Sequence, residues 1–325
     1  MKKFFGILLY MSVQRFPSTR SYWSPTFGYS LISSVMSVNK FEKIKLSLHF
    51  QNNDNHKPVG HLDHDRLFKI RPVIEHLNEK FSNIPMEQRL SVDEQMCATK
   101  VAHFLKQYLP NKPHKWGFKL YVLCDLSGFA HKFEIYSGQE NTGRLDGEPD
   151  IGATGNVVIR LVRGVPRLLN HIVYFDNFYT SLPLVHYLAK NGIHSVGTVQ
   201  QNRIPKSKLP EKKEFMKKSV ARGSYEERVS SYDGIDMACV AWKDNKVVTL
   251  LCTYVGSLPI STVTRYDKTK KEKVPISCPH IVQEYNKHMG GVDLMDSFLG
   301  RYHITIRSKK MVPKNILSFT GLNSY

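Results

Sequence analysis

The chain has 325 residues, of which 41% are hydrophobic and 11% aromatic, so a wholly disordered protein is excluded. That length is enough for about two or three domains. Its 46 Lys and Arg outnumber 28 Asp and Glu, which gives a formal net charge of +18. A protein this basic repels itself unless a polyanion is present, so the charge favours nucleic acid as the partner. A basic scaffold protein would carry the same charge, so charge alone does not choose a chemistry.

The first 88 residues are predicted to be helical. The start of the chain combines a basic end with an apolar run, as a signal peptide does, but Gly6 interrupts the run and no small-residue cleavage site follows. We interpret it instead as an amphipathic helix whose buried face consists of Phe4, Ile7, Leu8 and Met11. Apolar residues at helical spacing indicate two more helices: Phe41, Ile44 and Leu48, then Ile74, Leu77 and Phe81. No other segment is long and apolar enough to cross a membrane, so we expect neither export nor a membrane partner.

From residue 89 the apolar pattern changes from helical to strand periodicity. Two strands, 118–125 and 130–136, are predicted to be joined by a turn, and a helix is predicted at 157–162. A strand at 171–176, a helix at 181–190 and a strand at 193–199 follow as a strand–helix–strand unit. Asn191-Gly192 ends the second of these helices. This order predicts an α/β fold, in which helices pack on the faces of a mixed sheet.

Residues 201–276 differ in composition from the segments before them. Their 16 Lys and Arg outnumber 9 Asp and Glu, and long apolar runs are rare apart from 247–255. We interpret this segment as a basic inserted module that is partly strand. Pro279 then opens a helix whose apolar stripe is Ile281, Val282, Tyr285 and Met289. The last segment, 297–325, contains basic residues and no acid.

The cysteines indicate neither a zinc module nor a disulfide framework. There are five of them, an odd number, and they form no C-x-x-C pair. Cys124 and Cys252 lie in apolar runs and are expected to be small buried hydrophobic residues. This usage fits a reducing compartment.

Four aspartates in three different contexts are the candidate functional residues. Asp93 lies in a strand-like run, Asp176 closes the apolar strand at 171–176, and Asp293 and Asp296 lie three residues apart. Carboxylates from three distant segments can meet at the end of one sheet and hold divalent metal ions against a phosphate backbone.

Each of the first two aspartates also has a plainer interpretation. Asp93 can be a solvated edge carboxylate paired with Arg or Lys. Asp176 stands at the carboxyl end of a strand, where open α/β sheets place their ligands. It can equally form an Asx turn at the strand exit, with Thr180 or Ser181 capping the next helix.

The other two aspartates lie on the same side of a predicted helix, since residues three apart are neighbours there. Two like charges so close favour a bound metal or a nearby Arg or Lys. Alternatively, Gly290-Gly291 begins the helix and the acids after it complement the helix dipole. Each aspartate is ambiguous by itself, but their joint placement favours a metal site.

Basic and aromatic residues supply further candidates for DNA contact. The lysine run within 206–218 can be a solvated loop, but in a protein of charge +18 a phosphate contact is as consistent. Tyr108 and Trp116 flank the basic stretch 112–115 and can stack on an unpaired base, although the simpler interpretation places Trp116 in the core. No Walker-type loop, G-x-S-x-G elbow or H-E-x-x-H occurs, so nucleotide hydrolysis, serine hydrolase and zincin chemistry have no support.

Five runs carry a family pattern in order along the chain: SVDEQM at 91–96, KPHKWGFKL at 112–120, FEIYSG at 133–138, FDNFYTS at 175–181 and YNKHMGGVDLMD at 285–296. Further matches at 4–23 and 302–310 extend the pattern over most of the chain. In these runs the sequence resembles the piggyBac family of DDE/D transposases and the host proteins derived from it.

The resemblance implies an RNase H-like catalytic core that is interrupted by an insertion domain and flanked by a helical domain for dimerisation and DNA binding. The expected domains are 1–88 (helical, first part), 89–200 (catalytic core, first part), 201–276 (basic insertion), 277–296 (core, last acidic helix) and 297–325 (remnant of the helical domain).

By resemblance, Asp93, Asp176 and Asp293 match the catalytic triad of the family, and Asp296 matches a further acid. Together they would bind two Mg²⁺ or Mn²⁺ ions, one activating water or a DNA 3′-hydroxyl and the other stabilising the leaving oxygen. The family cuts at transposon ends, forms hairpins there and joins the element into TTAA sites. We therefore expect double-stranded DNA as partner, a homodimer and a nuclear location. The expected DNA contacts are Lys112, Lys115, Lys212, Lys213, Arg301, Arg307, Lys309 and Lys310.

The chain departs from the family pattern at both ends, so we expect a truncated copy. The usual acidic leader is missing, and a short tail beginning at Met311 replaces the usual Trp, long apolar helix and cysteine-rich zinc-binding tail. Two hypotheses follow. The chain is a DDE/D transposase domain with intact acids that binds metal but transposes poorly or not at all, or a domesticated, catalytically silent DNA- or chromatin-binding protein.

Overall fold

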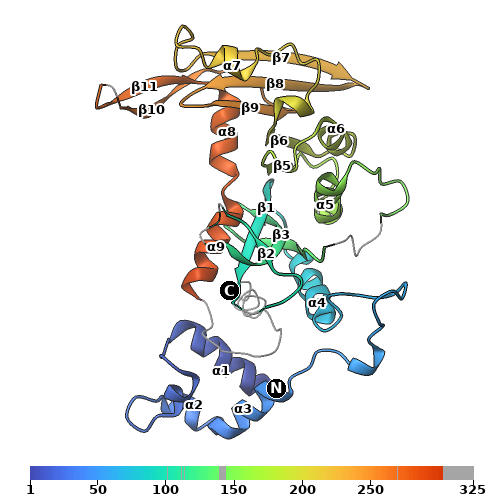
Figure 1. Ribbon diagram of the computed structural model, residues 1–325, viewed down its shortest axis with the longest axis vertical. Coiled ribbons are helices and arrows are strands. Elements are labelled where there is room, and N and C mark those ends of the chain that lie inside the picture. The colour runs from blue at the N-terminus through green and yellow to red at the C-terminus, as the bar shows by residue number, and fades with distance from the viewer. Residues whose placement is uncertain (101, 111, 113, 139–143, 269, 303–325) are drawn as a thin grey trace.

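The computed structural model describes residues 1–100, 102–110, 112, 114–138, 144–268 and 270–302. The molecule is elongated, with a helical unit at one end, a sheet in the middle and a strand-rich unit at the other end (Figure 1). The helical unit contains α1 (Lys2–Val13), α2 (Ser30–Ser33) and α3 (Val38–Ser47). The expected apolar face of α1 is buried in the core of this unit: Phe4, Ile7, Leu8 and Met11. The prediction of an amphipathic helix at the start of the chain is confirmed.

Helix α4 (Arg71–Ser82) joins the helical unit to the sheet. Pro72 lies in its first turn, where a missing amide hydrogen costs nothing. Its apolar stripe is buried against the sheet, as the helical spacing predicted: Ile74, Leu77 and Phe81. The Asn78 side chain also donates to the carbonyl of Phe133 (3.0 Å) and accepts from its amide (2.9 Å), which satisfies backbone groups of the adjoining strand.

Nine strands within the described residues form one mixed sheet, in the order β2-β3-β1-β5-β6-β9-β8-β7, with β4 beside β3. The bounds are β1 (Arg89–Ala98), β2 (Gln107–Tyr108), β3 (Trp116–Asp125), β4 (Ala130–Ile135), β5 (Ile172–Phe175), β6 (His194–Thr198), β7 (Tyr225–Tyr232), β8 (Ile235–Lys243) and β9 (Val247–Cys252). Strand β5 runs parallel to its neighbours β1 and β6, and the other pairs are antiparallel. The predicted hairpin and the strand–helix–strand unit are both present.

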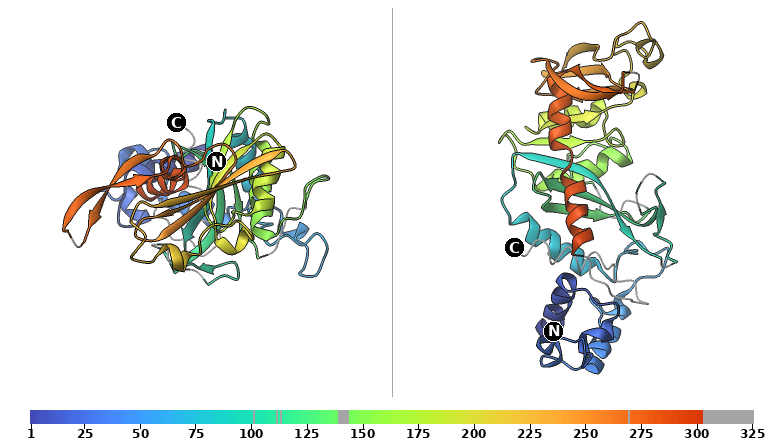
Figure 2. Two further views of the ribbon diagram at one scale, coloured as in Figure 1. Left: turned by 90° about the horizontal axis from the view of Figure 1, so that it is seen from above. Right: turned by 90° about the vertical axis from the view of Figure 1, so that its left-hand side faces the viewer.

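Helices cover both faces of this sheet. On one face lie α5 (Ala153–Leu161) and α6 (Leu182–Lys190); on the other lie α8 (His280–His288) and α9 (Gly291–Arg301) (Figures 1 and 2). Helices α8 and α9 follow one another as a column along the long axis of the molecule (Figure 2). Because apolar residues fill both interfaces, the central strands are buried on both sides, and the predicted α/β architecture is confirmed.

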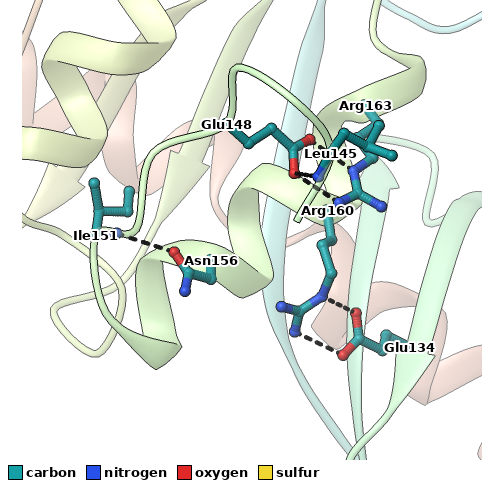
Figure 3. Close-up of polar contacts among 7 residues, drawn as sticks. All are labelled: Glu134, Leu145, Glu148, Ile151, Asn156, Arg160 and Arg163. Atoms are coloured by element: carbon teal, nitrogen blue, oxygen red, sulfur yellow. Dashed lines mark hydrogen bonds and ion pairs between the residues drawn. The ribbon is translucent and has the colours of Figure 1, made fainter. Parts of the chain in front are cut away.

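Paired ionic contacts fix α5 to its surroundings. Arg160 donates two hydrogen bonds of 2.8 Å to the carboxylate of Glu134 on β4, and Arg163 donates two of 2.7 Å to Glu148 (Figure 3). Arg160 is almost fully buried, so removing either partner would leave a charge in a region of low polarity. The helix predicted at 157–162, in spite of its β-branched residues, overlaps the C-terminal half of α5, and its last residue, Val162, begins the 3-10 turn Val162–Gly164 that carries Arg163.

The segment 201–276 does not stand apart from the sheet. Its strands β7, β8 and β9 continue the sheet, because β9 pairs with β6 through Val196 and Cys252. Only β10 (Ser261–Asp267) and β11 (Glu272–Cys278) form a separate two-stranded ribbon. Apolar residues of β8 and β9 also share cores with the central strands. The segment adds an edge to the sheet, and its status as a domain of its own stays a prediction.

All five cysteines are buried and free, which confirms the expectation for Cys124 and Cys252. None of the helices within the described ranges combines the length and apolar character that crossing a bilayer requires.

Candidate active site

Two of the four aspartates lie at the same level of neighbouring strands, Asp93 within β1 and Asp176 directly after β5. Val92 on β1 pairs with Phe175 on β5 in a parallel register. The next residue on each strand is Asp93 and Asp176, respectively. Parallel strands present equivalent positions side by side, so the two carboxylates emerge next to each other at one edge of the pairing.

The alternation of side chains places both carboxylates on the face that α8 and α9 cover. Val92 and Phe175 belong to the core beneath α5 and α6, whereas Tyr174 packs in the core that includes α8. Since neighbouring residues of a strand point to opposite faces, Asp93 and Asp176 point toward the α8–α9 side. The strand positions and the covering helices together decide where the acids meet.

Backbone contacts hold the carboxylate of Asp176. Its Oδ1 accepts a hydrogen bond from the Phe178 amide (2.8 Å), and the Oγ of Ser181 caps α6 by accepting from Leu184 (3.4 Å). The Asx turn and helix cap of the plainer interpretation are thus real. They do not compete with a role in a site, because the turn fixes the direction of the carboxylate at the strand end.

Arg203 forms hydrogen bonds with the turn that follows Asp176. One guanidinium nitrogen, Nη1, donates to three backbone carbonyls, those of Asn177 (2.8 Å), Phe178 (3.0 Å) and Thr180 (3.1 Å). This contact comes from the segment after β6 and was not expected from the sequence. It restrains the loop on which the position of Asp176 depends.

A glycine lies where the helix that carries Asp293 and Asp296 approaches the sheet. Helix α8 ends before Gly290, and α9 begins at Gly291 with Asp293 in its first turn. A Cβ atom on Gly291 would lie 2.3 Å from the carbonyl oxygen of Asp125 and 2.6 Å from the Oγ of Ser91. Only a glycine allows the helix to approach the sheet this closely.

Asp296 is fastened directly to the strand that carries Asp93. The side-chain amide of Gln95 donates to Asp296 Oδ1 at 2.9 Å. Gln95 follows Asp93 by two residues and therefore lies on the same face of β1. Asp293 lies one turn before Asp296 on α9 and is exposed, and its charge contributes to the raised pKa of Asp93 and of Asp296. Asp93, Asp176 and Asp296 therefore lie on the α8–α9 side of the sheet, and Asp293 lies on the same helix as Asp296.

The acids destabilise one another's charged forms. Burial, together with the charges of Asp176 and Asp293, raises the pKa of Asp93 to about 6. Burial is also the main cause that raises the pKa of Asp176 and of Asp296 above their ordinary values. Shifted carboxyl groups that meet in one place are typical of functional sites, because a bound cation would relieve the repulsion.

Lys112 lies among these carboxylates. Its Nζ donates to the carbonyl oxygen of Glu94 at 2.8 Å, and its charge lowers the pKa of Asp93, Asp176 and Asp296. The sequence predicted a DNA contact for Lys112, and the structure places its ammonium group at the acidic site. The pairing was not foreseeable from spacing, since eighteen residues separate Lys112 from Glu94.

The donor set fits divalent metal ions. Within the described parts of the chain, no three Asp, Glu, His or Cys side chains lie close enough to complete the ligands of one ion. Mg²⁺ is commonly held by only one or two carboxylates, with water and phosphate oxygens filling its octahedron. The carboxylates of Asp93 and Asp176, which lie side by side on one face of the sheet and are hard oxygen donors, match that requirement. The roles of the four aspartates as catalytic residues and metal ligands stay predictions.

The other expected DNA-contacting residues are spread over the molecule. Lys212 and Lys213 are exposed in α7 (Lys212–Phe215), which lies at the strand-rich end (Figure 1). Lys115 is exposed in the loop before β3, and Arg301 is exposed at the end of α9. Three more lie outside the described residues: Arg307, Lys309 and Lys310.

The expectation that Trp116 is buried in the core is wrong. Trp116 is 53% exposed and its cross-strand neighbour Tyr108 is 48% exposed. Among the described residues, β2 lies at an edge of the sheet and is only two residues long. The side chains that do enter the core from this stretch are those of Phe118 and Leu120.

Comparisons with known proteins agree with this architecture. A family model described as Transposase IS4 matches residues 1–325. The human PiggyBac transposable element-derived protein 3 is 30% identical over 322 residues, which are 97% of this chain and 52% of that protein. The human PiggyBac transposable element-derived protein 2 is 30% identical over 316 residues, 95% of this chain and 51% of that protein. The chain thus spans about half the length of these curated relatives.

A solved structure shares the fold. It is a cryo-EM structure of a piggyBac transposase synaptic complex with hairpin DNA, with a TM-score of 0.75 and 23% sequence identity. The match covers 98% of this chain and 62% of that chain. The mixed sheet with helices on both faces is accordingly an RNase H-like core.

Proposed function

Because the chain belongs to the piggyBac family of transposases and proteins derived from them, we propose that it is a DDE/D-type DNA transposase domain. In this proposal it binds double-stranded DNA and cuts and joins phosphodiesters with two divalent metal ions, Mg²⁺ or Mn²⁺. The observation that supports the proposal is that Asp93 and Asp176 occupy successive positions after a paired level of adjacent parallel strands, with Asp296 of α9 bonded to Gln95 on β1.

We propose Asp93, Asp176 and Asp293 as the catalytic residues and, with Asp296, as the metal ligands. The bound ions would supply the charge that activates an attacking hydroxyl and stabilises the leaving oxygen. The protein's own contribution is to hold its carboxylates in place, through the turn after Asp176 and the Gln95 amide. Lys112 adds a positive charge beside them, where the phosphate of a DNA strand would lie.

The net charge of +18 and the DNA in the related synaptic complex support a DNA partner. We extend the proposal to transposon ends and TTAA target sites, to a homodimer and to a nuclear location, all by family likeness. The division into a helical domain, a catalytic core and the insertion 201–276 is part of the same proposal.

A second candidate function is that of a domesticated DNA- or chromatin-binding protein whose acidic site is silent. It is favoured by the human relatives, which are named as proteins derived from transposable elements. Such a protein would keep the fold and the positive charge without cutting DNA.

Incubation of the purified chain with Mn²⁺ and a supercoiled plasmid that contains TTAA sites separates the two functions. The transposase proposal expects nicking that falls by at least about a hundredfold in Asp176→Asn. The matched control is Asp236→Asn, which changes an exposed aspartate on β8 and should leave nicking unchanged. Plasmid binding by a wild-type protein that leaves the plasmid intact would instead support the silent DNA-binding protein.

A further inference from the structure

Tyr108 and Trp116 form an exposed aromatic pair at the edge of the sheet. They face each other across β2 and β3, their ring centroids are 4.8 Å apart, and the ring planes are tilted by 44°. About half of each side chain is open to solvent. Burying two large aromatic rings would lower the free energy, so an exposed pair is a candidate binding surface.

Two lysines lie beside this pair. The ammonium group of Lys106 lies 5.2 Å from the centroid of the Trp116 ring, and Lys115 is exposed in the adjoining loop. Flat apolar rings beside cations match the chemistry of a nucleotide, whose base offers an aromatic face and whose phosphate carries negative charge. An apolar protein partner would have no comparable use for the cations.

One short loop connects the aromatic pair with the acidic site. The Leu109 amide donates to the Lys115 carbonyl at 2.8 Å, which closes the loop just above the pair. From the same loop, the ammonium group of Lys112 reaches the carbonyl of Glu94, beside Asp93. A DNA strand that passes Lys112 at the acids therefore has a cationic path toward the rings.

The register of the sheet gives the length of that path. Trp116 precedes Gly117, which pairs with Ala98, five residues beyond Asp93 on β1. At the rise of an extended strand this separation is roughly 17 Å. That length corresponds to about five stacked nucleotides.

We propose that Tyr108 and Trp116 bind an unpaired base of a single-stranded DNA segment that lies within about five nucleotides of the phosphodiester at the acidic site. The identity of the ligand as DNA rests on the proposed function. The rings stack on the base, and Lys106 and Lys115 contact the adjoining phosphates. Duplex DNA keeps its bases stacked inside the helix and does not satisfy this surface.

The experiment measures binding of the full chain to a labelled ten-nucleotide oligothymidylate, in EDTA so that cleavage plays no part. A ten-nucleotide DNA strand in which every position is abasic provides a probe with the same phosphates and no bases. Trp116→Ser and Tyr108→Ser remove one ring each, and Trp116→Phe keeps a ring. Tyr266→Ser, which removes an exposed tyrosine from the distant ribbon β10–β11, is the matched control.

Loss of one ring should weaken oligothymidylate binding by roughly five- to a hundredfold, while Trp116→Phe and Tyr266→Ser stay within about twofold. The wild type should bind the abasic backbone more weakly by a similar factor, and the ring-deleted variants should lose this preference for bases. Oligothymidylate should also quench the protein's tryptophan fluorescence, because the base stacks on Trp116. The change can be assigned to Trp116, since Trp242 is buried and the indole of Trp23 donates to the Met36 carbonyl.

The proposal is overturned if the wild type binds the abasic backbone as tightly as oligothymidylate, or if folded ring-deleted variants bind like the wild type. If the pair only stabilised the loop, removing one ring would lower the stability toward urea without changing the preference for bases. If Trp116→Ser fails to fold, the abasic comparison on the wild-type chain still decides. If the protein nicks plasmid but shows no preference for bases, only this inference is contradicted. If it prefers bases but does not nick plasmid, only the catalytic proposal is contradicted.

Discussion

Gln95 donates its side-chain amide to the carboxylate of Asp296 at 2.9 Å, which links β1 to α9 across 201 residues of chain. The contact joins the strand of Asp93 to the helix of Asp293 and Asp296. It fixes the separation of two acidic segments that no local sequence feature connects. A site made of distant segments depends on such links for its geometry.

The first prediction is that Gln95→Leu loosens the acidic site without unfolding the protein. Leucine has a similar volume but cannot donate to Asp296, so the carboxylate loses its partner. Partners of metal ligands typically contribute about ten- to a hundredfold to metal affinity or activity. We expect Mn²⁺ affinity, measured by calorimetric titration, to fall in that range. Gln88→Leu, at an exposed position just before β1, should keep wild-type affinity, and equal affinity of both variants would contradict the role of Gln95.

The second prediction concerns the close approach of α9 to the sheet. A methyl group at Gly291 would clash with the Asp125 carbonyl and the Ser91 hydroxyl, whereas a methyl at Gly290 meets nothing within 4 Å. Gly291→Ala should therefore lower the free energy of unfolding in urea by about 1–3 kcal/mol. Gly290→Ala should change it by less than about 0.5 kcal/mol. Comparable losses in the two variants would show that the helix does not need this contact.

The third prediction is that Lys112 neutralises the acids when no metal is bound. In Lys112→Met the carboxylates of Asp93, Asp176 and Asp296 lose the cation that faces them. In EDTA the variant should be less stable than the wild type by about 1–2 kcal/mol. Mn²⁺ should then raise its melting temperature more than that of the wild type, because the metal replaces the missing charge.

Lys115→Met serves as the control for this substitution, since Lys115 is an exposed lysine of the same loop. Its melting temperature should respond to Mn²⁺ as the wild type does. If the response of Lys112→Met is also unchanged, the ammonium group does not act on the acids.

The fourth prediction is a pH dependence of stability in the metal-free protein. The folded-state pKa of Asp93 is raised to about 6 from 3.8, so between these values the folded chain holds a proton that the unfolded chain releases. The free energy of unfolding contributed by this group is therefore highest below pH 4 and decreases as the pH rises through 6. The decrease is on the order of 1–3 kcal/mol.

Asp93→Asn isolates this contribution, because asparagine does not titrate but keeps the oxygen that accepts from the Glu94 amide. In EDTA the variant should gain stability relative to the wild type between pH 4 and pH 7, as measured by urea unfolding. A constant difference across that range would show that Asp93 ionises without a cost in the folded state.

Much of the fold follows from local patterns in the sequence. The apolar spacing of Phe4, Ile7 and Leu8 marks the buried face of a helix, and Asn191-Gly192 marks the end of α6. The pattern of 171–176 identifies a strand that is buried on both faces and ends in an acid. Such features are predictable because a residue's periodicity reports which of its faces meets the core.

Three features lay beyond local patterns. Each of them joins segments that are separated in the chain: β9 pairs with β6, Lys112 donates to the Glu94 carbonyl, and Arg203 donates to the turn after Asp176. Exposure of Trp116 belongs with them, since its residue type suggested a core position. What covers a side chain depends on the neighbouring strand, and that neighbour is chosen by the whole sheet.

For this protein the sequence by itself determined the element types, the α/β class and the identity of the four candidate acids, because these depend on residue type and short-range spacing. Only the tertiary structure decided that Asp93 and Asp176 share one level of the sheet and one face. It also decided that Gly291 lets α9 approach the sheet closely and that Lys112 reaches the backbone next to Asp93. Those outcomes depend on strand register and on side-chain packing between segments up to about two hundred residues apart, neither of which spacing along the chain encodes.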